Sequence, residues 1–208
     1  MIILGLGSNL GDSLKNLRLA VQLLKKTGAI DSIRVSPLYT SSALLPTNAP
    51  TDWNRPYLNI ALACESSLSP MALLTIVKKI EHQIGRSEST RWAPRLIDID
   101  ILAWHDEIIN EPTLQIPHPE LQNRPFALWP LLDLWPTWSF PHRNLQEIVM
   151  HWGSRFEGTA PLATRRLPHP VCRYFECHSR FVLRWGLLYN GSRCITSSRT
   201  LTGVAHTQ

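Results

Sequence analysis

Hydrophobic positions repeat with two different periods along the main part of the chain. Four short apolar runs bounded by glycine, proline or polar residues predict strands, at residues 2–6, 33–39, 57–65 and 96–102. Two longer segments carry apolar residues every three or four positions and predict amphipathic helices, at residues 13–27 and 70–84. The order strand–helix–strand–strand–helix–strand is the split βαβ, or ferredoxin-like, arrangement of an α+β fold, in which helices cover an antiparallel sheet.

Both helices have recognisable ends. Asp12 or Ser13 can cap the first, and Gly28 ends it. The second begins at Ser69-Pro70, a cap followed by proline at the first helical position, and Gly85 closes it. The residues expected to face the core are Leu14, Leu17, Val21 and Leu24 in the first helix, and Met71, Leu74, Val77 and Ile84 in the second.

The remaining elements are shorter. A hairpin is expected around residues 105–106, a turn at 117–119, and helical segments at 126–134 and 144–152. Two long loops, at residues 41–56 and 86–94, are typical of functional lids or of disordered segments.

Composition fits one cytoplasmic domain. A chain of 208 residues with 44% apolar residues can fill a single core. It has no apolar run of membrane-spanning length, and its start has no basic flank or cleavage site, so we expect a soluble, unexported protein that does not act at a membrane.

The basic pI near 9.3 comes from the tail. Residues 1–161 hold 14 Lys and Arg against 15 Asp and Glu, whereas residues 162–208 hold seven arginines against a single glutamate. The near-neutral main part, which also lacks an RNP-type motif, argues against a nucleic-acid partner, including the RNA-binding class of ferredoxin-like domains. We therefore predict a domain at residues 1–158 and a linker with a basic, poorly ordered tail at 159–208.

The tail also holds three of the four cysteines. Cys172, Cys177, His178 and Cys194 lack the tight pair usual in zinc sites, and a cytoplasmic setting disfavours disulfides. Truncated or frameshifted sequence after a linker is the leading explanation of this segment.

Asp98 and Asp100 lie two apart in the last apolar run. On a strand both carboxylates face the same side, while Ile97, Ile99 and Ile101 face the other. Neighbouring carboxylates repel unless a cation lies between them, and oxygen ligands suit Mg²⁺ that is shared with phosphates. Arg91 and Arg95 add fork-shaped phosphate donors. The pattern predicts a metal–phosphate site, although a lone Asp-x-Asp is as often a solvated strand edge.

Four ordered motifs resemble one known family. They are Gly5-Leu6-Gly7-Ser8-Asn9-Leu10-Gly11-Asp12, Tyr57-Leu58-Asn59, Gly85-Arg86 with Arg91-Trp92-Ala93-Pro94-Arg95-Leu96-Ile97-Asp98-Ile99-Asp100, and Ile116-Pro117-His118 leading to Asn123-Arg124-Pro125-Phe126. Together they are similar to 6-hydroxymethyl-7,8-dihydropterin pyrophosphokinase, an enzyme of folate synthesis, over residues 1 to about 155. The resemblance implies ATP as co-substrate, two Mg²⁺ ions, AMP as product, and possible coupling to dihydropteroate synthase, to which this kinase is fused in some bacteria.

The resemblance also implies roles for individual residues. The implied metal ligands are Asp98 and Asp100, and the implied catalytic set adds Arg86 and Arg95. The implied nucleotide-binding residues are Glu81, Arg86, Trp92, Arg95, Ile101, His118 and Arg124. The implied pterin-binding residues are Ser42, Leu44, Tyr57, Asn59, Trp92, Asp98 and Phe126. Taken alone, His118 reads more readily as a turn histidine, and Tyr57 and Phe126 as core residues.

Two departures affect the nucleotide side of the site. The loop Arg86-Ser87-Glu88-Ser89-Thr90-Arg91-Trp92 is short and weakly basic for the family, and Pro119 follows His118 where some members carry an aromatic residue. A catalytically silent pterin-binding module is the alternative. It would keep Tyr57, Asn59 and Phe126 but would need neither aspartate.

Overall fold

The computed structural model describes residues 1–86, 92–141, 148 and 159–161. All of them belong to one compact unit, Met1–Arg165. Most of the helix expected at 144–152, the loop residues 87–91 with Glu88 and Arg91, and the cysteines of the tail lie outside the described residues. No helix in the described part is both long and apolar enough to cross a membrane.

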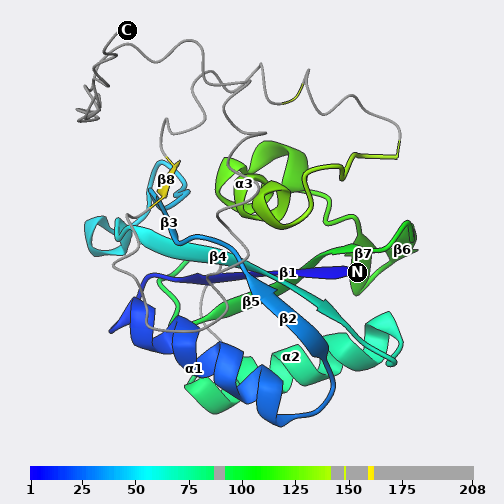
Figure 1. Cartoon of the computed structure of the whole chain (residues 1–208). Coiled ribbons are helices and arrows are strands. Elements are labelled where there is room, and N and C mark those ends of the chain that lie inside the picture. The colour runs from blue at the N-terminus through cyan, green and yellow to red at the C-terminus, as the bar shows by residue number, and fades with distance from the viewer. Residues whose placement is uncertain (87–91, 142–147, 149–158, 162–208) are drawn as a thin grey trace, which may run out of the picture. The chain divides into compact units, whose positions relative to one another are not determined.

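An antiparallel sheet forms the centre of the fold (Figure 1). Its strands are β1 (Ile2–Ser8), β2 (Asp31–Val35), β3 (Tyr39–Ser41), β4 (Tyr57–Glu65), β5 (Asp98–Trp104) and β8 (Thr159–Pro161). The strands run in the order β5-β1-β4-β3-β8, and β2 pairs with the other end of β4. This order, with the helices between the strands, confirms the ferredoxin-like α+β prediction.

Two helices, α1 (Ser13–Lys26) and α2 (Pro70–Ile84), cover one face of the sheet (Figure 1). The predicted caps are present: Asp12 accepts a hydrogen bond from the Lys15 N–H, and Ser69 accepts one from the Ala72 N–H. Gly85 takes the left-handed conformation, with φ of 108°, that ends α2. Ile97, Ile99 and Ile101 are buried in this helix-facing core, as their alternation with the aspartates predicts.

The helix α3 (Pro125–Leu134) packs on the opposite face of the sheet (Figure 1). Its Leu128, Leu131 and Leu134 share a second buried cluster with Ile3 of β1 and Leu102 of β5. Short elements complete the description: 3-10 turns at Thr51–Trp53 and Leu121–Asn123, and a two-stranded hairpin of β6 (Ile109–Glu111) and β7 (Leu114–Ile116). The site is built between α3 and the sheet.

Three sequence predictions are wrong in detail. The strand expected at 33–39 is divided into β2 and β3, because Pro37 has no N–H and Ser36 instead bonds β4 through its own N–H and hydroxyl. The hairpin forms between β6 and β7 rather than around residues 105–106. Met71 is 44% exposed, because it lies on the side of α2 opposite to Leu73 and Ile80, which fill the core instead.

Strand β8 follows directly after the boundary predicted at residue 158. Thr159 pairs with Ser41 and Pro161 with Tyr39, so these three residues extend the sheet beside β3. The boundary itself stays a prediction.

We expect a chain that ends at residue 162 to keep its melting temperature and its activity, because β8 is retained and every residue of the candidate site lies before it. Thermal melting and the AMP assay described below would check this. A chain that ends at residue 158 is the matched control, since it loses β8 and exposes the edge of β3. Loss of activity in the chain that ends at residue 162 would show that the active fold needs residues after 162.

Candidate active site

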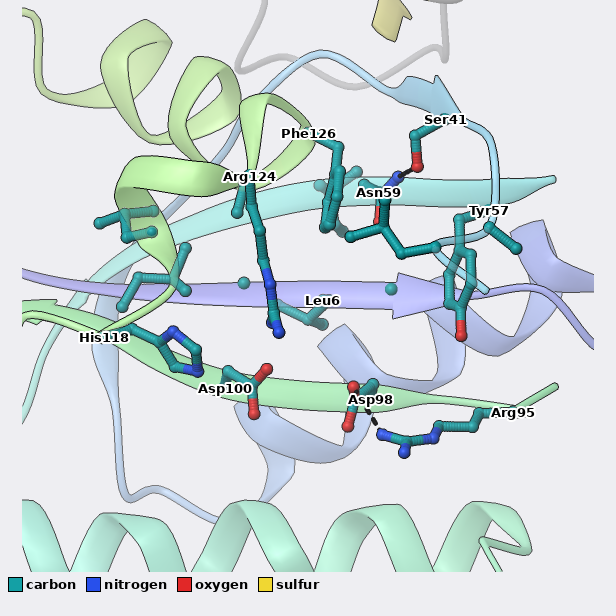
Figure 2. A pocket seen from close by; sticks show the side chains of 18 of the residues that line it. Leu6, Ser41, Tyr57, Asn59, Arg95, Asp98, Asp100, His118, Arg124 and Phe126 are labelled. Atoms are coloured by element: carbon teal, nitrogen blue, oxygen red, sulfur yellow. Dashed lines mark hydrogen bonds and ion pairs between the residues drawn. The ribbon is translucent and has the colours of Figure 1, made fainter. Parts of the chain in front are cut away.

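One cavity of about 200 Å³ brings together residues from five segments of the chain. They come from β1, from β3 and the loop after it, from β4, from β5 with the residues before it, and from the stretch that leads into α3 (Figure 2). The sequence-predicted residues that line it are Ser42, Leu44, Tyr57, Asn59, Trp92, Arg95, Asp98, Asp100, His118, Arg124 and Phe126. Glu81, Arg86 and Ile101 are the predicted site residues outside this lining.

The two aspartates lie side by side on the cavity face of β5 (Figure 2). In the pairing with β1, Asp98 lies opposite Gly7 and Asp100 opposite Gly5. Neither glycine has a side chain, and neighbouring side chains lie over both positions. A methyl group at Gly5 would come within 2.9 Å of Leu102, and one at Gly7 within 3.1 Å of the Asn59 side-chain oxygen.

The carboxylates form a site suited to a cation. Desolvation in the cavity, followed by the neighbouring charge of Asp98, raises the pKa of Asp100 above its ordinary value. A divalent ion relieves both effects. Within the described part of the chain, no group of three or more acidic, histidine or cysteine side chains is placed to hold a metal. The pair therefore fits an ion such as Mg²⁺, which takes the rest of its shell from water and substrate oxygens.

Two arginines hold Asp98. Arg86 Nη1 lies 2.6 Å from Asp98 Oδ1, and Arg95 Nη1 lies 3.0 Å from Oδ2. The backbone of Arg95 is fixed by the Gly-Ser-Asn motif at the end of β1: its N–H donates to the Asn9 side chain at 2.7 Å, and its carbonyl accepts from the Asn9 and Leu10 N–H groups. The motif thus positions the residue that precedes the aspartates.

Glu81 lies behind this arrangement and does not face the cavity. It is 1% exposed, accepts a hydrogen bond from the Ile99 N–H at 2.6 Å, and pairs with Arg86 and Lys78. Its carboxylate is committed to orienting Arg86, so any effect on a nucleotide is indirect. The Ile101 side chain is 3% exposed on the helix side of the sheet, which leaves only its backbone for contact with a ligand.

His118 and Arg124 approach Asp100 from the other side (Figure 2). The Glu120 N–H donates to His118 Nδ1 at 3.2 Å, and burial lowers the pKa of the ring. A neutral ring that accepts at Nδ1 carries its proton on Nε2, where it can donate to an anion. Arg124 Nε is buried and has no hydrogen-bond partner in the described part of the chain. An unpaired buried guanidinium nitrogen at a cavity wall is the arrangement that a bound anion would satisfy.

The other end of the cavity is aromatic. Phe126 from the start of α3 and Tyr57 from the start of β4 lie on either side of Asn59 (Figure 2). Asn59 is 6% exposed and donates to Ser41 Oγ at 3.0 Å, which fixes its amide plane. A fixed amide between two aromatic faces suits a flat heteroaromatic ligand. Trp92 also lines the cavity, and its φ is 75°.

Sequence reasoning missed three contributors. Ser41 orients Asn59, Gly7 gives room to Asn59 and Tyr57, and Lys78 lies beside Asp100. Gly7 stands in a motif that the sequence does display, whereas no local pattern distinguishes Ser41 or Lys78 from ordinary residues of a strand or helix.

Comparison with known proteins identifies the family of the chain. The family model described as 7,8-dihydro-6-hydroxymethylpterin-pyrophosphokinase matches residues 3–136, well over half of the chain. A pyrophosphokinase of 2-amino-4-hydroxy-6-hydroxymethyldihydropteridine from Aquifex aeolicus is 39% identical over 135 residues, which cover 65% of this chain and 80% of the relative. The protein of the same name from Pseudomonas aeruginosa is 34% identical over 149 residues, covering 71% and 89%.

Longer proteins match through one part only. The folate synthesis bifunctional protein of Chlamydia muridarum is 39% identical over 137 residues, which cover 65% of this chain but 30% of that protein. A crystal structure of Plasmodium falciparum HPPK-DHPS with pterin and p-hydrobenzoate shares the fold, with a TM-score of 0.53 at 15% identity over 73% of this chain and 44% of that one. From its motifs, its fold and these matches, the chain belongs to the 7,8-dihydro-6-hydroxymethylpterin-pyrophosphokinase family.

Proposed function

We propose that this protein transfers a pyrophosphoryl group from ATP to the hydroxymethyl group of 6-hydroxymethyl-7,8-dihydropterin and releases AMP, as a step of folate synthesis. Family membership supports the reaction. The observation that carries it to this chain is the single cavity in which the Asp98 and Asp100 carboxylates face an amide flanked by two aromatic rings. Such a cavity can bind the phosphates of ATP close to the hydroxymethyl group of a flat acceptor.

Asp98 and Asp100 would hold two Mg²⁺ ions. The position of both carboxylates in the cavity lining and the raised pKa of Asp100 support this assignment. When bound, the ions would neutralise charge on the phosphates and lower the pKa of the acceptor hydroxyl. The protein itself would supply orientation, because the reaction needs a neutral alcohol aligned with the β-phosphorus.

The remaining cavity residues divide into two groups. The first group would bind the nucleotide: Arg95, His118 and Arg124 would contact phosphate oxygens. Trp92 would also contact the nucleotide, and so would Arg86, which is paired with Asp98 in the structure. The Ile101 backbone faces the same free edge of β5 as that of Ile99, two residues earlier, and would contact the nucleotide there. Tyr57, Asn59 and Phe126 would hold the pterin, with Ser42 and Leu44 at the rim of its slot.

Gly7→Ala is expected to weaken pterin binding selectively. The added methyl group would lie 3.1 Å from the Asn59 oxygen and 3.5 Å from the Tyr57 ring, so it must displace residues of the slot. We expect pterin affinity to fall about tenfold or more, since a shifted amide loses roughly one hydrogen bond's worth of binding.

Calorimetric titration with the pterin and with a non-hydrolysable ATP analogue would show whether pterin binding weakens while nucleotide binding is unchanged. Ser41→Ala is a second variant of the same amide: it removes the bond that fixes Asn59 without adding an atom to the slot, and it should also weaken pterin binding. Unchanged pterin affinity in Gly7→Ala would contradict the assignment of Asn59.

The direct test of the function is AMP formation from ATP in the presence and absence of the hydroxymethyl pterin. Pterin-dependent AMP release, with the pterin gaining two phosphates, is the expected result. Pterin binding without AMP release would instead favour a catalytically silent pterin-binding module. AMP release that does not depend on the pterin would contradict the proposed acceptor.

We also propose functional coupling to dihydropteroate synthase, which would consume the pyrophosphorylated pterin. The similarity to bifunctional folate synthesis proteins and to HPPK-DHPS structures supports this. A cytoplasmic location remains part of the proposal, because the reaction consumes ATP.

A further inference from the structure

Lys78 lies beside the aspartate pair although it belongs to the helix on the opposite face of the sheet. Its Nζ donates to the Ile99 carbonyl at 3.2 Å and to Glu81 Oε1 at 3.1 Å. The same nitrogen lies 3.8 Å from Asp100 Oδ1. The ammonium group therefore sits at the free edge of β5, next to the carboxylate that faces the cavity.

The cations around the two aspartates are divided between them. Arg86 and Arg95 pair with Asp98, whereas Lys78 supplies the one ion pair made by Asp100 within residues 1–86 and 92–141. Each proposed metal ligand is thus already paired with a cation. A metal ion that binds to the protein alone must compete with these cations.

Two fixed partners, the Glu81 carboxylate and the Ile99 carbonyl, hold Lys78 beside Asp100. Glu81 is 1% exposed and cannot follow the lysine into solvent, and the Ile99 carbonyl is fixed in β5. Arg95 differs, because its side chain lines the cavity and can exchange Asp98 for a phosphate. The positive charge of Lys78 consequently stays near Asp100 whether the site is empty or filled.

We propose that Lys78 is a positioning residue whose fixed charge opposes metal binding to the free protein and makes metal loading depend on the nucleotide. Without nucleotide, its charge repels a divalent ion held by Asp100. With nucleotide, the same charge attracts the phosphates, so the repulsion is offset. The inference rests on the proposed function, since it requires that the aspartates hold a metal together with ATP.

The test is binding of Mn²⁺, as a stand-in for Mg²⁺, to the full-length protein with and without a non-hydrolysable ATP analogue. Lys78→Gln removes the charge and can still donate to the Ile99 carbonyl. We expect it to bind Mn²⁺ alone about tenfold more tightly than the wild type. Removing the charge removes its repulsion of the bound ion, and screening by solvent and salt limits the gain to about that factor. The gain in Mn²⁺ affinity on adding the analogue should shrink by a similar factor.

Three further variants complete the design. Lys78→Arg keeps the charge and should behave as the wild type. Lys79→Gln removes a neighbouring exposed charge from the same helix and should leave Mn²⁺ affinity unchanged. Lys78→Met is a second neutral variant, for use if the glutamine variant melts at a lower temperature.

Equal Mn²⁺ affinity of the free wild-type, Lys78→Gln and Lys78→Met proteins would overturn the inference. An equal gain in Mn²⁺ affinity in Lys79→Gln would also overturn it, because the effect would then reflect the net charge of the protein and not the position of Lys78. Failure of the proposed function has a different signature. In that case the wild type would bind no Mn²⁺ even with the analogue present and would release no AMP on addition of the pterin.

Discussion

Asp98→Asn and Asp100→Asn are each expected to lower the rate of AMP formation by about a thousandfold or more. Each variant keeps the size of the side chain but removes one of the two charges that would hold Mg²⁺ against the phosphates. The measurement is pterin-dependent AMP release at saturating Mg²⁺ and ATP. Asp106→Asn, in the exposed turn after β5, is the matched control and should retain full activity.

The two variants should differ in stability without metal. Because the folded state raises the pKa of Asp100, its ionised form destabilises the metal-free protein at pH values above the ordinary aspartate pKa, so Asp100→Asn should melt at the same or a higher temperature. Asp98→Asn should melt at a lower temperature, because two arginines lose their shared partner. Near-wild-type turnover in either variant would contradict the proposal that Asp98 and Asp100 hold Mg²⁺.

Arg124→Met is expected to lower kcat/KM for ATP by about a hundredfold or more, mainly through weaker nucleotide binding. The Arg124 side chain points into the cavity toward Asp100 (Figure 2), and its buried Nε has no partner in the described part of the chain. A bound phosphate would satisfy that donor. Removing the guanidinium therefore costs binding but should not lower the melting temperature.

Steady-state kinetics with ATP varied would measure this effect. Arg124→Lys should fall between the wild type and Arg124→Met, because it keeps the charge but not the fork of donors. Arg18→Met, on the exposed face of α1, is the control for loss of one positive charge. A wild-type KM for ATP in Arg124→Met would show that this arginine does not contact the nucleotide.

The sequence by itself determined the features that depend on local periodicity. The alternation of Asp98 and Asp100 with three isoleucines follows from the two-residue repeat of a strand, and the structure places the two sets on opposite faces. The ends of α1 and α2 follow from Asp12, Ser69 and Gly85, because caps act on the nearest turn of backbone. These interactions join residues within about four positions, so a single sequence displays them.

Tertiary structure decided which residues meet at the site. The resemblance placed Glu81 on the nucleotide, but the fold buries its carboxylate behind β5, where it orients Arg86. The division of the strand at 33–39 depended on Ala61 of β4, whose N–H donates to the Ser36 hydroxyl instead of to a backbone carbonyl. The burial of Glu81 has no local sequence signal, because it depends on a strand that lies far away along the chain. Pro37 is a local signal for the division, but its bonding partner on β4 is not visible in the sequence.

Lys78 shows the same limit most clearly. On α2 it reads as one of two adjacent lysines, and only the packing of that helix beside β5 brings its ammonium group within 3.8 Å of an Asp100 oxygen. Charge interactions depend on distance in space and on local dielectric, and neither quantity is encoded in spacing along the chain. The chemical groups of this site can therefore be read from the sequence, whereas the fold determines which charges each of them meets.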